Sequence, residues 1–89
     1  MTDTTNPTLP PSDAFLAEIF NHVGGRIQIL PKGIEYRSEQ LCGYDYWEML
    51  TPGQQKQAGK CIRQLAEMGF LPLVIVKKRH EYPLYFMIV

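Results

Sequence analysis

The clearest hydrophobic pattern lies in the C-terminal half of the chain. Between residues 54 and 67, apolar side chains recur at intervals of three and four residues, with charged side chains between them. This spacing places the apolar side chains on one side of an α-helix. The apolar positions are Ala58, Cys61, Ile62 and Leu65, and the polar ones are Lys56, Lys60, Arg63 and Glu67. The pattern predicts an amphipathic helix with one buried and one exposed face.

Residues with defined preferences mark both ends of this helix. Thr51 can accept a hydrogen bond from the third helical amide, Pro52 fits the first helical position, and Gln54 can bond back to the Thr51 amide. Gly69 suits the left-handed residue that ends many helices, and Phe70 can supply the accompanying apolar contact. We therefore expect the helix to begin after Thr51 and to end before Gly69.

Two apolar runs follow, at residues 73–76 and 84–89, and both are rich in β-branched and aromatic side chains. The residues after the first run, Lys-Lys-Arg-His-Glu at 77–81, are too polar to be buried. The sequence predicts an antiparallel hairpin with an exposed basic tip. Because successive residues in both runs are apolar, both faces of this hairpin are apolar, whereas an antiparallel pair with one exposed face normally alternates.

The N-terminal part predicts an arm and a first helix. Residues 1–11 are rich in threonine and proline with few apolar side chains, which is typical of a flexible arm. Ser12 can cap a helix, and apolar side chains recur from Phe15 to Val23 until Gly24 and Gly25 interrupt the pattern. We expect a helix that ends at these glycines, inside a single domain at residues 12–89.

The middle of the chain has a weaker pattern. Residues 26–30 and 34–36 alternate around turn chemistry at 31–33, which predicts a short hairpin or one strand leading into a loop. Ser38, with Glu39 and Gln40 after it, offers a further helix start. For the interval from Leu41 to Leu50 we expect a helix broken by Gly43, with Trp47 and Leu50 turned inward.

Composition limits the class of protein. A chain of 89 residues forms one domain, and its formal net charge of zero gives no general reason to bind a polyanion. The charges are nevertheless divided: residues 1–50 hold seven acids and three bases, a net charge of −4, and residues 51–89 hold six bases and two acids, a net charge of +4. The basic half coincides with the predicted helix and hairpin.

Two further features bear on location. Cys42 and Cys61 are the only cysteines, which favours a reduced, cytoplasmic protein over a secreted one held by a disulfide. No apolar segment approaches the roughly 20 residues that a membrane-spanning helix needs. We therefore expect no membrane partner.

The predicted order is helix, short strand or hairpin, short helix, capped helix, hairpin. This order resembles that of winged helix-turn-helix domains, and the resemblance implies an α+β fold of about three helices with a C-terminal antiparallel β-hairpin. It also implies that the capped helix enters the major groove of DNA while the hairpin touches the backbone or minor groove. Separately, residues 47–54, Trp-Glu-Met-Leu-Thr-Pro-Gly-Gln, resemble a segment of small uncharacterised phage and mobile-element proteins.

On this interpretation the chain is a small DNA-binding or regulatory protein that uses a helix face and a hairpin tip. Side chains that suit phosphate oxygens and base edges lie on the exposed face of the capped helix, and basic ones lie at the tip. The predicted nucleic-acid-binding residues are Lys56, Gln57, Lys60, Arg63, Gln64, Lys77, Lys78 and Arg79. Solubility alone also places charged residues on helix surfaces and turns, so this alternative stays open.

The two-sided apolar hairpin supports a different function, a protein-binding module that forms a homodimer or inhibits a host protein. Something has to cover the second apolar face. A partner chain would do so, and the alternative is that the residue 27–36 segment joins the sheet while the helices cover both of its sides. The predicted interface residues are Leu73, Ile75, Leu84, Phe86 and Ile88.

Motifs for catalysis are missing from the sequence. It contains no glycine-rich phosphate loop, nucleophile elbow or paired-carboxylate motif. His22, Cys42, Cys61 and His80 are widely separated, whereas zinc sites generally draw ligands from close pairs. We expect neither an enzyme nor a metal or cofactor site, and no small-molecule substrate.

Overall fold

A computed structural model of the chain describes residues 13–76 and 85–89. The elements are α1 (Asp13–Ile27), β1 (Glu35–Tyr36), α2 (Ser38–Cys42), α3 (Tyr44–Glu48), α4 (Pro52–Glu67), β2 (Leu73–Val76) and β3 (Tyr85–Ile88). In the described part of the chain the strands form one antiparallel sheet with the order β1-β3-β2. The predicted α+β class and C-terminal hairpin are confirmed. The described residues form four helices instead of about three, because the interval after residue 38 splits in two.

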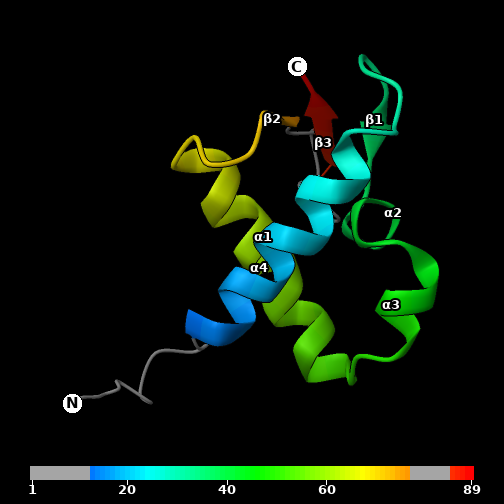
Figure 1. Cartoon of the computed structure of the whole chain (residues 1–89), viewed down its shortest axis with the longest axis vertical. Helices are drawn as coiled ribbons and strands as arrows, with labels where there is room; N and C mark the ends of the chain where they lie inside the picture. The colour runs from blue at the N-terminus through cyan, green and yellow to red at the C-terminus, as the bar shows by residue number, and fades with distance from the viewer. Residues whose placement is uncertain (1–12, 77–84) are drawn as a thin grey trace.

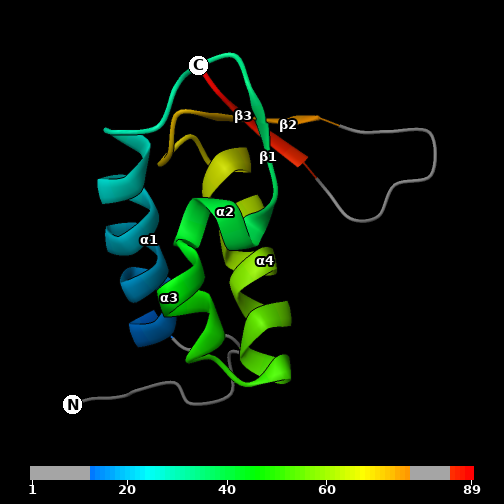
Figure 2. The ribbon, with the colours of Figure 1, turned by 90° about the vertical axis from the view of Figure 1, so that its right-hand side faces the viewer.

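The core lies where the helices meet one face of the sheet. Figure 1 and Figure 2 show the strands gathered at the end of the molecule where α1 and α4 finish. Helix α4 packs against α1, α2 and β2, and α1 packs against α2. The buried core residues are Ile19, Val23, Tyr36, Leu41, Cys42, Ala58, Cys61, Ile62, Leu65, Leu71, Leu73, Phe86 and Ile88. All of the apolar positions predicted for α4 are therefore buried.

Both predicted ends of α4 are confirmed. Thr51 Oγ1 accepts from the Gln54 amide at 3.1 Å, and the Thr51 amide donates to Gln54 Oε1 at 2.9 Å, so two amides without helical partners are satisfied. At the other end Gly69 has φ of 80°. The amide of Phe70 donates to the Leu65 carbonyl at 2.9 Å, and that of Gly69 to the Ala66 carbonyl at 3.2 Å. The helix is closed at both ends by its own neighbouring residues.

The predicted end of α1 at Gly24 and Gly25 is wrong. The helix continues through both glycines to Ile27. A glycine inside a helix costs roughly 1 kcal/mol relative to alanine, and here tertiary contacts offset that cost. Ile27 packs against the core, and Arg26 Nη2 donates to the Gln40 carbonyl of α2 at 2.9 Å.

Of the two alternatives predicted for residues 26–36, the short hairpin is wrong, because only one short strand forms there. Residues 26 and 27 are helical, and residues 28–34 form turns and a loop, which the Tyr36 hydroxyl holds by donating to the Pro31 carbonyl at 2.7 Å. Only Glu35 and Tyr36 are extended, and they pair with Met87 and Phe86 of β3. This segment therefore contributes an edge strand to the C-terminal hairpin.

The break at Gly43 is confirmed. Gly43 has φ of 89° and separates α2 from α3, which leaves Trp47 and Leu50 packed against the core as expected. The start of α2 differs by one residue from the prediction. Arg37 is the capping residue, and its amide donates to Gln40 Oε1 at 2.8 Å, so Ser38 lies within the helix.

Candidate nucleic-acid interface

Helix α4 presents the predicted polar residues as a stripe along its outer side. Lys56, Lys60 and Gln64 are exposed, and Gln57 and Arg63 are half-buried. Figure 2 shows α1 on one side of α4 and β2 running toward the other side. The stripe lies opposite the buried residues of α4 on the helix, and α1 packs against α4, so the stripe does not face α1.

The stripe is divided by contacts within the chain. Arg63 Nε lies 3.2 Å from Glu67 Oε2, so this arginine is paired with an acid one helical turn away. Gln64 Nε2 lies 3.7 Å from Met68 Sδ. Within the described part of the chain, no hydrogen bond or ion pair occupies the side chains of Lys56, Gln57 or Lys60. The groups available to a ligand therefore lie in the N-terminal half of α4.

Two other glutamines of α4 support the fold. The side chain of Gln54 completes the cap with Thr51. Gln55 Nε2 donates to the Trp47 carbonyl at 3.0 Å, which ties α4 to the end of α3. Nothing in the residue spacing singled out Gln55 for this contact, because it depends on how α3 approaches α4.

The predicted contacts at the hairpin tip, Lys77, Lys78 and Arg79, lie outside the described residues, as does Leu84. The strands that lead to the tip are described, and they pair in register from Leu73 with Ile88 to Val76 with Tyr85.

The remaining residues predicted for a protein interface belong to the core. Leu73, Phe86 and Ile88 are buried, and Ile75 packs against the core. They lie on the face of the sheet that the helices cover, so Leu73, Phe86 and Ile88 are not accessible to a partner and Ile75 is accessible only in part. Burial therefore contradicts the first three of these four residues as an interface.

The opposite face of the sheet also carries apolar residues, which were not among the predicted interface residues. Side chains alternate across a strand, and the strand register places the remaining residues of β2 and β3 on this second side. We call Val74, Val76, Tyr85, Met87 and Val89 the outer-face cluster. Val74 is 47% exposed and Val89 is 60% exposed. Glu35, on β1, lies at the margin of the cluster, next to Met87.

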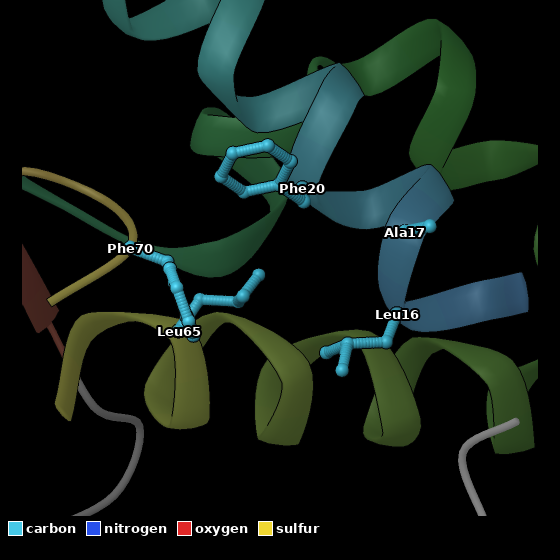
Figure 3. Close-up of a pocket in the computed structure, with 5 residues that line it drawn as sticks. All are labelled: Leu16, Ala17, Phe20, Leu65 and Phe70. Carbon is cyan, nitrogen blue, oxygen red and sulfur yellow. The ribbon is translucent and has the colours of Figure 1, made fainter. Parts of the chain in front are cut away.

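An open apolar hollow of about 300 Å³ lies between α1 and the end of α4. Figure 3 shows the side chains that line it, Leu16, Ala17 and Phe20 from α1 and Leu65 and Phe70 from the α4 end. None of these five side chains ionises or carries a nucleophile. The hollow offers no group for acid–base or nucleophilic chemistry.

Titratable groups in the core are also poorly suited to chemistry. Cys42 and Cys61 are buried free thiols. Burial raises the pKa of Cys42 to about 12 and that of Cys61 to about 11, so both stay protonated and weakly nucleophilic at neutral pH. Burial, together with the Glu18 carboxylate, raises the pKa of Tyr46 to about 12. His22 stacks on the Tyr46 ring, with ring centroids 3.8 Å apart.

The described residues contain no group of three histidine, cysteine or acidic side chains that could hold a metal ion. Within the same residues, no helix is long and apolar enough to cross a membrane. Comparison of the chain with protein-family models, curated proteins and solved structures gives no match.

Proposed function

We propose that the chain is a small DNA-binding protein of winged-helix type, which contacts duplex DNA through the exposed stripe of α4 and the basic tip of the β2–β3 hairpin. The observation that carries the proposal is the exposed stripe of α4 followed in the chain by an antiparallel pair of strands. Lys56 and Lys60 are exposed and Gln57 is half-buried on α4, and β2 and β3 pair with each other after that helix. A helix that enters the groove and a hairpin that follows it suit one duplex and its adjacent backbone.

The topology supports the same proposal. The elements follow the order α1-β1-α2-α3-α4-β2-β3, and β3 lies between β1 and β2 in the sheet. In a winged-helix domain a hairpin likewise follows the helix that enters the major groove. Here that helix would be α4, with its start fixed by the Thr51 cap.

The division of charge adds an electrostatic reason. Residues 51–89 carry a net charge of +4, although the whole chain is neutral. Lys56 and Lys60 are exposed and have no ion-pair partner among the described residues. They can therefore neutralise phosphates without first breaking an ion pair within the chain. The paired Arg63 would contribute less.

Fluorescence anisotropy with a labelled duplex at about 50 and 200 mM salt tests the proposal. We expect binding that weakens with salt. Lys56→Ala with Lys60→Ala, and separately Lys77→Ala with Lys78→Ala and Arg79→Ala, should each lower the affinity. The slope of log K against log salt should fall by about 0.9 for each phosphate contact removed. Lys32→Ala, an exposed lysine in the loop before β1, is the matched control. Absence of binding at the lower salt concentration would rule the proposal out.

The outer-face cluster supports a second candidate, a protein-binding surface. Val74 and Val89 are exposed, and apolar side chains left exposed on one face of a sheet are typical of contacts with another protein. Self-association is its simplest form, because these side chains of one copy can pack against the same side chains of a second copy.

Sedimentation velocity over a range of protein concentrations tests this second candidate. We expect the wild-type chain to form a dimer as its concentration rises, and Val74→Glu to prevent it. Met49→Glu is the matched control, since Met49 is an exposed apolar residue between α3 and α4, far from the sheet in sequence. A wild-type chain that stays monomeric at every concentration would contradict self-association.

A further inference from the structure

The four glutamines of α4 differ in what their side chains contact. Gln54 bonds to the Thr51 amide at 2.9 Å, Gln55 to the Trp47 carbonyl at 3.0 Å, and Gln64 lies 3.7 Å from Met68 Sδ. Gln57 is the one glutamine of α4 whose side chain has no hydrogen-bond partner among the described residues. Its donor and acceptor are both available to a ligand.

We infer that Gln57 is the residue with which this chain distinguishes one base pair from another, and that it recognises adenine in the major groove. The inference rests on the proposed function. A glutamine amide can donate to adenine N7 and accept from the adenine N6 amino group at the same time, a pairing that no other base pair offers in this geometry.

The surroundings of Gln57 suit this role. Lys56 precedes it, and Lys60 lies three residues later on the same part of the helix surface. Two lysines that contact phosphates would fix the register of the helix on the duplex while carrying no sequence information themselves. Gln57 is half-buried, so part of its side chain is already out of solvent before a base binds.

Charge and hydrogen bonding argue against the other polar residues of α4 as readers of bases. Arg63 would have to leave Glu67, and Gln64 lies at the same end of the helix as that acid. Gln55 would have to release α3. Among the glutamines and the arginine of this surface, Gln57 is therefore the one whose side chain can contact a base without first losing a contact within the chain.

Selection from a pool of random-sequence duplexes, followed by anisotropy on single-position variants of the selected duplex, tests the inference. We expect one adenine whose replacement weakens wild-type binding by about 5- to 150-fold, the range that one bidentate contact supplies. Gln57→Ala should bind all four variants at that position equally. Gln57→Arg should prefer guanine there, because arginine pairs with guanine N7 and O6. Gln28→Ala, at an exposed glutamine in the turn after α1, should keep the adenine preference, and circular dichroism should show that all variants fold.

The possible outcomes distinguish failure of this inference from failure of the proposal that the chain binds DNA. If the wild-type chain binds no duplex at low salt, both fail. If it binds but selects no sequence, or if Gln57→Ala keeps the adenine preference, the chain binds DNA and Gln57 does not read it. Loss of the preference in Gln57→Ala, with its retention in Gln28→Ala, supports the inference.

Discussion

Helices α1 and α4 pack against each other over the same core, but their ends are stabilised in different ways. Helix α4 is closed at its start by Thr51 and Gln54 and at its end by Gly69 and Phe70, all adjacent to the helix in sequence. The described end of α1 is different. It passes through two glycines, and Arg26 in its last turn bonds to Gln40 of α2, fourteen residues away.

The difference shows which helix depends on the rest of the fold. The hydrogen bonds that fix both ends of α4 form together with the helix itself. Once the apolar face of this helix is buried, its period also determines where the exposed stripe lies. The last turn of α1 is stable only where α2 and the core are already in place. Substitutions at matched positions in the two helices should therefore have different effects on stability.

The largest effect is expected for Leu65→Ala in α4. Leu65 is 4% exposed and belongs to the core, so truncation should lower the free energy of unfolding by about 2 to 5 kcal/mol. Urea denaturation followed by circular dichroism measures the change. Leu16→Ala is the control in α1, because Leu16 lines the same hollow but is only half-buried. An equal decrease in the free energy of unfolding for both variants would show that the decrease comes from the lining of the hollow and not from the buried face of α4.

A smaller loss is expected for Gly69→Ala at the end of α4. With φ of 80°, Gly69 holds a backbone conformation that disfavours any side chain, although nothing within 4 Å would touch an added Cβ. The backbone preference alone should lower the free energy of unfolding by about 1 to 2 kcal/mol. Chemical denaturation of the variant provides the measurement. A variant as stable as the wild type would mean that the helix ends equally well without a left-handed residue.

The same distinction explains how much of the fold the sequence predicted. Thr51, Gln54 and Gly69 act on neighbours within a few residues, so residue type alone predicted both ends of α4 correctly. Gly24 and Gly25 carry the same kind of local signal, but contacts of Arg26 and Ile27 with distant residues outweigh it. The pairing of Glu35 with Met87 is also long-range. The sequence offered, as one alternative, that residues 27–36 join the sheet, but no local pattern indicated the partner strand or the register.

The candidate surfaces follow this rule as well. The stripe of α4 could be predicted because the helix period separates Lys56 and Lys60 from the buried residues. The accessible face of the hairpin could not, because Leu73 and Val74 are equally apolar and only the position of the helices decides which of them is buried. Likewise, the pairing of Arg63 and the freedom of Gln57 depend on side-chain geometry and not on residue type.

The smallest expected effect has the opposite sign and tests α1 directly. Gly24 is helical, its φ is not positive, and nothing lies within 4 Å of an added Cβ. Gly24→Ala should therefore raise the free energy of unfolding by about 0.5 to 1 kcal/mol, because alanine loses less backbone entropy when the helix forms. Thermal and urea denaturation, with Gly69→Ala measured in parallel, would show a gain at one glycine and a loss at the other. A loss at both would mean that the helix ends at Gly24 in solution, and that the contacts of Arg26 and Ile27 do not extend it.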